Sequence, residues 1–142
     1  MEIFVGVDVG SVSTNIVALS ESGEIVFKYY VRTNGQPMDA VKFGFSRLRE
    51  EHNDPTVLGI GTTGSGRQLA AVLLGADIVK NEITAHGVAA FREVKEVRTI
   101  FEIGGQDSKI ILIREGMVTD FAMNTVCAAG TGSFLDHQSE RL

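Results

Sequence analysis

Apolar residues in the first third of the chain are spaced as in short strands joined by tight turns. An apolar run at residues 3–9 predicts a strand that is buried on both faces. Residues 15–19 and 24–32 predict two further strands, one entered through a polar turn and the other through Ser22-Gly23. Because connections this short join antiparallel neighbours, the pattern predicts a three-stranded meander.

After the meander, the apolar residues are spaced as in an α-helix. Apolar residues from Met38 to Leu48 recur on one helical face, and Pro37 suits the start of a helix over residues 38–51. The pattern then predicts a strand at 57–60, a loop at 61–66, a short helix near 69–73, a strand at 78–79 and a helix at 82–94. This alternation of strands and helices is typical of the α/β class.

A second meander is predicted further along the chain. Its strands are expected at 99–103, 110–113 and 118–122, with a helix after them at 134–142. The charged stretch 92–98 is expected to be an exposed connection, so we divide the chain into a first domain at 1–96 and the beginning of a second at 97–142. Only one helix follows the second meander, and no stop signal precedes Leu142. The second domain is therefore expected to be truncated and the chain to be a fragment.

The composition is that of an ordinary globular chain, with 142 residues of which 44% are hydrophobic and 22% charged. The formal net charge of −5 disfavours a nucleic-acid surface, which needs clustered Lys and Arg, but says little against ATP. A single cysteine excludes an intramolecular disulfide framework and fits a reducing cytoplasm. No apolar run approaches the roughly 20 residues of a membrane span. We expect a cytoplasmic protein that binds neither nucleic acid nor membrane.

The first turn of the first meander carries groups suited to a phosphate. Gly10 permits close approach of a ligand, and a carboxylate, Asp8, stands at the end of the preceding strand. Hydroxyl groups that can donate hydrogen bonds come from Ser11, Ser13 and Thr14. The turn is therefore a candidate phosphate site.

The corresponding turn of the second meander has a similar character. Gly104 and Gly105 permit close approach, and Gln106 can hydrogen-bond a phosphate. Asp107 can hold Mg²⁺ through water, and Lys109 either meets a phosphate or points to solvent. Two such turns on two similar meanders are expected to face each other across a cleft and to hold a triphosphate from both sides.

The only cysteine, Cys127, stands among small residues just before the predicted helix at 134–142. A helix start favours a nearby anion or thiolate, and Thr131 or Ser133 could cap this helix, with Asp136 completing a near capping box. A lone cysteine in such surroundings is more often a buried hydrophobe than a ligand. The residues alone leave both interpretations open.

Three segments carry a resemblance to a known family, and they are VGVDVGSVST at 5–14, EIGGQDSK at 102–109 and NTVCAAGTGSF at 124–134. The paired turns resemble those of the acetate and sugar kinase, heat-shock-70 and actin superfamily, whose ATPase domains are ribonuclease-H-like. More narrowly, the segments resemble the ATP-dependent activators of 2-hydroxyacyl-CoA dehydratases, a family that includes the ATPase subunits of benzoyl-CoA reductases. The match covers nearly the whole chain.

The resemblance implies a homodimeric ATPase that uses Mg²⁺ and shares one 4Fe–4S cluster between its subunits. Cys127 matches the first cluster ligand, and the second family cysteine would lie beyond Leu142. Such a protein hydrolyses ATP to ADP, takes electrons from ferredoxin or flavodoxin and passes them one at a time to the dehydratase or reductase. Catalytic roles would fall to Asp8, Gln106 and Asp107. A dimer of this chain supplies only two thiols, so we expect it not to hold a four-cysteine cluster by itself.

Other functions share parts of the pattern. A small-molecule kinase would use the same turns with a carboxylate base such as Asp120, although it leaves Cys127 unexplained. A ribonuclease-H-like nuclease would gather Asp8, Glu102 and Asp107 around two metal ions, although the chain lacks a basic patch. A non-catalytic nucleotide-binding module is a further alternative.

Three neighbouring features are expected to be structural or remain open. The loop at 61–66 is expected to lead into a helix rather than take part in catalysis. Arg67 at the helix start could meet an anion or solvent, and solvent is favoured. Glu102 either supports a Mg²⁺ water shell or only ends a strand.

Overall fold

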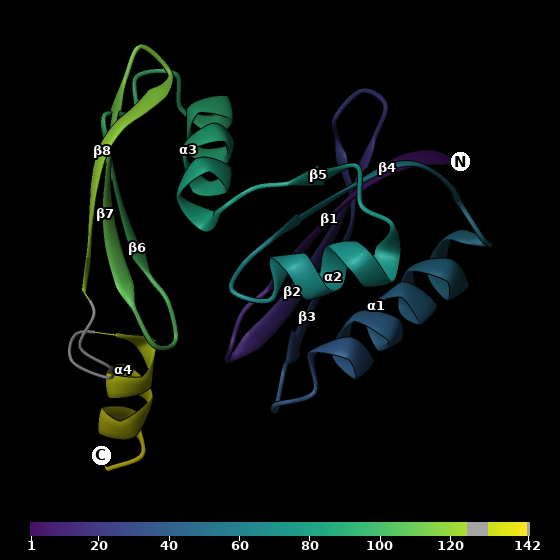
Figure 1. Cartoon of the computed structure of the whole chain (residues 1–142), viewed down its shortest axis with the longest axis horizontal. Coiled ribbons are helices and arrows are strands. Elements are labelled where there is room, and N and C mark those ends of the chain that lie inside the picture. The colour runs from purple at the N-terminus through teal and green to yellow at the C-terminus, as the bar shows by residue number, and fades with distance from the viewer. Residues whose placement is uncertain (125–130, 142) are drawn as a thin grey trace. The chain divides into compact units, whose positions relative to one another are not determined.

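The computed structural model describes residues 1–124 and 131–141, which form two compact units at Met1–Asn81 and Glu82–Leu142 (Figure 1). No helix in the described part of the chain has the length and apolar character that crossing a membrane requires.

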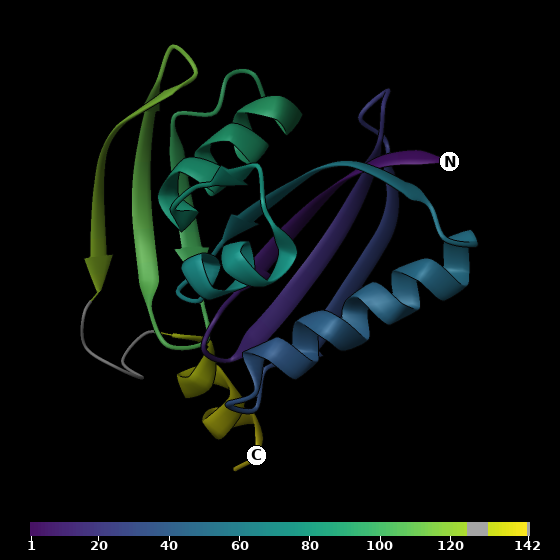
Figure 2. The ribbon, with the colours of Figure 1, turned by 45° about the vertical axis from the view of Figure 1, so that its right-hand side comes forward.

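The first unit is built on a five-stranded mixed sheet in the order β3-β2-β1-β4-β5. The strands are β1 (Glu2–Val9), β2 (Ser13–Ser20), β3 (Ile25–Arg32), β4 (Thr56–Thr63) and β5 (Ile78–Val79). The first three strands form the predicted antiparallel meander, whereas β4 runs parallel to β1 and β5 runs parallel to β4. The crossover from β3 to β4 passes through α1 (Pro37–His52), and α2 (Arg67–Leu74) links β4 to β5 (Figure 2).

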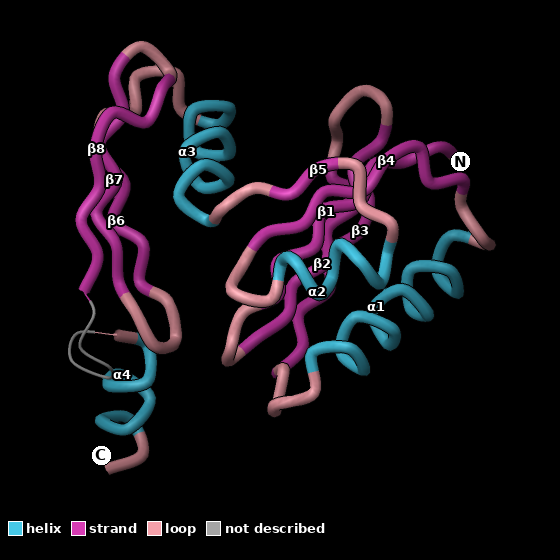
Figure 3. Tube along the Cα trace, viewed as in Figure 1, coloured by secondary structure: helices cyan, strands magenta, loops and turns pink. Residues whose placement is uncertain are grey.

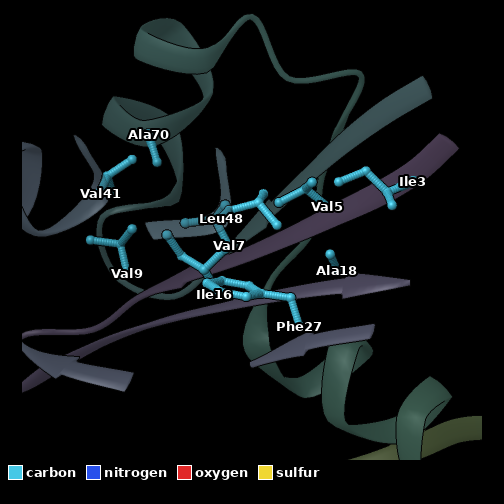
Figure 4. Packing of buried hydrophobic residues seen from close by; sticks show 10 residues of the cluster. All are labelled: Ile3, Val5, Val7, Val9, Ile16, Ala18, Phe27, Val41, Leu48 and Ala70. Carbon is cyan, nitrogen blue, oxygen red and sulfur yellow. The ribbon is translucent and has the colours of Figure 1, made fainter. Parts of the chain in front are cut away.

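Both helices of this unit pack on one face of the sheet. Val41 and Leu48 of α1 and Ala70 of α2 join a single buried cluster with alternate residues of the strands (Figure 4). The cluster consists of Ile3, Val5, Val7, Val9, Ile16, Ala18, Phe27, Val41, Leu48 and Ala70. Burial of every second residue on β1 shows which face of the sheet forms the core.

The expectation that the first strand is buried on both faces is wrong for this chain. Ile3 and Val5 are buried, but Phe4 between them is 45% exposed. Helices cover only the face to which the odd-numbered residues point, and successive side chains of a strand alternate between faces.

The second unit is a three-stranded antiparallel sheet in the order β6-β7-β8 (Figure 3). Its strands are β6 (Thr99–Ile103), β7 (Ser108–Arg114) and β8 (Met117–Asn124), and its helices are α3 (Glu82–Glu93) and α4 (Gly132–Ser139). Glu115 and Gly116 turn β7 into β8 with φ values of 52° and 77°, as a tight hairpin turn requires. The second meander therefore forms as predicted.

Helix α3 packs with the second meander. It contacts β7 and β8, and a Cβ atom on Gly87 would lie 2.5 Å from Cγ2 of Val118, so helix and strand approach closely. The compact units consequently divide after Asn81, earlier in the chain than the expected domain boundary after residue 96. The assignment of 1–96 and 97–142 to two domains stays a prediction.

Several element boundaries differ by a few residues from those expected. Strand β4 continues to Thr63, through half of the predicted loop at 61–66, because its pairing with β1 extends to the register Asp8↔Thr63. Helix α4 ends at Ser139 rather than at Leu142.

Candidate functional site

The first turn, between β1 and β2, is closed by its own backbone. The N–H of Gly10 donates to the carbonyl oxygen of Ser13 over 2.9 Å, and a Cβ atom on Gly10 would lie 3.0 Å from that oxygen. Glycine is therefore needed here for tightness of the turn, and its N–H is already occupied. Ser11 is exposed and Ser13 is half-buried, so these two residues lie at or near the surface of the turn.

Thr14 lies inside the unit and forms a hydrogen bond with Thr33, a residue that no local sequence pattern links to the turn. Its hydroxyl is 3.0 Å from the hydroxyl of Thr33, which itself donates to the carbonyl of Gly10 over 3.0 Å. Since a hydroxyl has one proton to give, Thr14 donates and Thr33 accepts. Both threonines are buried, and together they support the turn from below. The expected contact of Thr14 with phosphate stays a prediction.

The segment after β4 packs against the end of β1, beside Asp8. Gly64 has φ +87°, and a Cβ atom there would lie 2.4 Å from Oδ1 of Asp8 and 2.4 Å from the carbonyl oxygen of Val9. The N–H of Gly66 donates to that same carbonyl over 2.8 Å. The backbone of Gly64 therefore forms part of the wall against which the Asp8 carboxylate rests.

Two further side chains of this segment are held by its backbone. Arg67 donates to the carbonyl of Gly64 over 3.0 Å and is half-buried, so its guanidinium binds the backbone of this segment as well as facing solvent. The hydroxyl of Thr62 donates to the carbonyl of Arg67 over 3.1 Å. These bonds join the end of β4 to the start of α2, which agrees with a structural role for the segment.

The second turn, between β6 and β7, is also closed by a glycine. The N–H of Gly104 donates to the carbonyl oxygen of Asp107 over 2.8 Å, and a Cβ atom on Gly104 would lie 2.9 Å from Oδ1 of Asp107. Gln106 is exposed at the tip of this turn. The backbone thus allows the Asp107 carboxylate to fold back over the turn.

Lys109 is enclosed by carboxylates, and its side chain is only 4% exposed. Its Nζ lies 2.7 Å from Oδ1 of Asp107, 3.0 Å from Oε2 of Glu102 and 3.2 Å from Oε2 of Glu82. Burial by itself lowers the pKa of Lys109, but the hydrogen bonds to Asp107 and Glu102 and the charge of Glu102 outweigh it and raise that pKa. The lysine therefore does not point to solvent, and Glu102 binds it instead of merely ending a strand.

The start of α4 is joined to the second turn. The N–H groups of Gly132 and Ser133 donate to the carbonyls of Gly104 and Gly105 over 2.8 and 3.1 Å. The Ser133 hydroxyl also donates to the Gly105 carbonyl. The expected capping box of Ser133 with Asp136 is wrong, because α4 begins at Gly132 and no side-chain hydrogen bond caps it. Two N–H groups at the start of this helix are thus hydrogen-bonded to the second turn.

Cys127, the predicted cluster ligand, lies outside the described residues. Among the residues that the structure does describe, no three His, Cys, Asp or Glu side chains are placed to hold a metal ion directly. Of the predicted site residues, the structure brings Asp107, Glu102 and Lys109 together in the second unit. In the first unit it places Asp8 against the backbone of Gly64.

Thr131 offers a test of the packing at this helix start. It is 0% exposed, and its hydroxyl has no hydrogen-bond partner among the described residues. Thr131→Val should leave the free energy of unfolding unchanged or raise it by about 1 kcal/mol, because valine removes a buried unpaired hydroxyl. Urea denaturation measures this change.

Thr14→Val is the matched control, because Thr14 is equally buried but hydrogen-bonded to Thr33. It should lower the free energy of unfolding by about 1–3 kcal/mol, since it leaves Thr33 with an unpaired lone pair and removes a bond. A larger loss for Thr131→Val than for Thr14→Val would show that the Thr131 hydroxyl does have a partner in solution.

The chain is similar to proteins of known and unknown role. It is 34% identical over 132 residues to the (R)-2-hydroxyglutaryl-CoA dehydratase activating ATPase of Acidaminococcus fermentans, covering 92% of this chain and 50% of that protein. It is 38% identical over 143 residues to the uncharacterised protein YjiL of Escherichia coli, covering 100% and 54%. The chain thus spans about half the length of these relatives.

Solved structures of two activators share the fold. Component A of the A. fermentans (R)-2-hydroxyglutaryl-CoA dehydratase superposes with a TM-score of 0.86 at 32% identity, over 99% of this chain and 54% of that one. The activator of the 2-hydroxyisocaproyl-CoA dehydratase from Clostridium difficile, solved with bound ADPNP, superposes with a TM-score of 0.80 at 29% identity, over 98% and 52%. The expected α/β architecture of the actin-type ATPases is therefore confirmed. Because residues 5–142 match its sequence pattern, the chain belongs to the BadF/BadG/BcrA/BcrD ATPase family.

Proposed function

We propose that this chain is the ATP-binding and ATP-hydrolysing part of an activator of a 2-hydroxyacyl-CoA dehydratase or of a related aryl-CoA reductase. Family membership and the ADPNP bound to a similar activator support it. The observation that carries it is a repeated one: each unit has a glycine-closed first turn with a carboxylate at its edge, Asp8 in one and Asp107 in the other.

Hydrolysis of ATP would proceed by attack of water on the terminal phosphoryl group. Such transfer depends mainly on positioning and on electrostatic stabilisation of the phosphate oxygens. Asp8 and Asp107 would orient water and a hydrated cation, and Gln106 would bond a phosphate oxygen from the tip of its turn. The remaining phosphate contacts would come from Gly10, Ser11, Ser13, Thr14, Gly104 and Gly105.

The second turn fits Mg²⁺ held through water. Three carboxylates around one ammonium leave two formal negative charges at this turn, and Asp107 is 41% exposed. Mg²⁺ usually keeps several waters and takes one or two carboxylates together with substrate phosphates. Bound there, the ion would supply neutralisation of the triphosphate charge, while Asp107 would orient its water shell.

The cysteine content of the chain does not fit a complete iron–sulfur cluster. A 4Fe–4S cluster takes four thiolates, and the chain has one cysteine, so two copies supply two. We propose Cys127 as one ligand of a cluster shared between two subunits, with further ligands from residues outside these 142. Ferredoxin or flavodoxin would be the electron donor, and the dehydratase or reductase the acceptor, all in the cytoplasm.

Phosphate release from Mg·ATP, measured on anaerobically purified protein, tests the proposed activity. We expect slow hydrolysis that no sugar or carboxylic acid acceptor accelerates. Formation of a phosphorylated acceptor would overturn the proposal in favour of a small-molecule kinase.

Cys127→Ala tests the cluster ligand. In the full-length protein, isolated anaerobically from its own host, the variant should lose most of its bound iron and its visible absorption, while ATP binding stays near that of the wild type. Wild-type iron content in the variant would exclude Cys127 as a ligand.

A further inference from the structure

Lys109 occupies a position on β7 that a strand normally fills with an apolar residue. The residues buried on this strand alternate as Lys109, Ile111 and Ile113, so the lysine shares their face of the sheet. Burial of an unpaired ammonium is costly, and such a group is retained only with compensating charges. The three carboxylates around Lys109 provide them.

Each carboxylate comes from a different element. Asp107 belongs to the second turn, Glu102 lies on β6 directly opposite Lys109 in the ladder, and Glu82 is the first residue of α3. An ammonium has three N–H donors, and each can donate a hydrogen bond to one carboxylate. Lys109 therefore connects the turn, the strand and the start of the helix through a single charged atom.

We propose that Lys109 is a positioning residue that fixes the Asp107 carboxylate for nucleotide binding and transmits the state of the turn to Glu82 at the start of α3. This inference rests on the proposed ATPase function. It assigns to Lys109 a role through other residues in place of direct contact with phosphate.

The geometry gives the direction of the coupling. Lys109 holds Oδ1 of Asp107 while this side chain remains 41% exposed, so part of the carboxylate stays open to the water of a hydrated cation. When such a cation draws Asp107 away from Lys109, the ammonium can move closer to Glu82 and Glu102, and its attraction to these two carboxylates increases as the separations fall. Glu82 is also the first residue of the second compact unit, so a change there would occur where the chain passes from one unit to the other.

Substitution of Lys109 tests the positioning role. Lys109→Met in the full-length protein should lower kcat by about 100-fold, because a displaced carboxylate no longer orients the cation and its water. The Mg²⁺ concentration for half-maximal ADPNP binding should rise. Lys109→Arg, which keeps the charge, should recover part of both losses.

Lys28→Met is the matched control, because Lys28 also lies on a strand but is exposed. It should leave kcat and the Mg²⁺ dependence as in the wild type. Folded Lys109→Met protein that behaves like Lys28→Met in both measurements would overturn the inference.

Glu82→Gln tests the transmission and avoids the risk that Lys109→Met does not fold. At ADPNP and Mg²⁺ concentrations that saturate each protein, hydrogen exchange of residues 82–93 should change on nucleotide addition in the wild type, and this change should be largely lost in Glu82→Gln. An equal change in both proteins would overturn the coupling. Absence of ATP hydrolysis by a wild type that binds ADPNP would instead overturn the proposed function alone.

Discussion

Asp8→Asn should abolish most of the ATP hydrolysis while leaving the fold intact, with kcat reduced about 100-fold or more. The substitution keeps the shape of the side chain but removes its negative charge, which we propose orients water and a hydrated cation. Asp8 rests against the backbone of Gly64, so the asparagine should occupy nearly the same position. Phosphate release at saturating Mg·ATP measures the effect, and circular dichroism checks the fold.

Asp39→Asn provides the control for this prediction. Asp39 is exposed in the first turn of α1, far along the chain from both turns, and its loss should leave kcat unchanged. Comparable rates for Asp8→Asn and Asp39→Asn would remove Asp8 from the catalytic residues.

Gly64→Ala should lower the free energy of unfolding of the first unit by about 3 kcal/mol and impair hydrolysis as well. A side chain at φ +87° is strained, which costs about 1–3 kcal/mol. In addition, its Cβ atom would meet both the carbonyl oxygen of Val9 and the carboxylate of Asp8 at 2.4 Å, so backbone must move. Urea denaturation and phosphate release should both register the change.

Gly75→Ala separates these two costs. Gly75 also has a positive φ, of +63°, but a Cβ atom there would meet nothing within 4 Å. Its substitution should cost only about 1 kcal/mol and leave hydrolysis near that of the wild type. Equal losses in the free energy of unfolding and equal rates of hydrolysis for Gly64→Ala and Gly75→Ala would show that the close approach of Gly64 to Asp8 does not matter for function.

Local patterns determined a large part of the fold. The two meanders, their hairpin turns and the helices α1, α2 and α3 form close to where hydrophobic spacing and turn residues predict them. These features depend on interactions between residues near in sequence, and spacing reports on such interactions directly. The composition of the two turns, with glycine followed by polar residues, was recognisable for the same reason.

The tertiary structure decided which residues support these turns. Thr33 beneath Thr14, and Gly64 beside Asp8, come from segments that no local pattern links to the first turn. The sequence also did not show that one face of β1 is exposed, because an apolar run does not reveal whether helices cover one face of the sheet or both.

For this protein, the sequence by itself determined the family, the two glycine turns and the candidate carboxylates Asp8 and Asp107. Only the tertiary structure decided that Lys109 lies in the interior, bound to carboxylates that include Glu82. A lysine after a glycine turn has the same local pattern whether it meets a phosphate, solvent or a buried carboxylate. The choice depends on which distant side chains the packing of α3 on the sheet brings within reach of its charge.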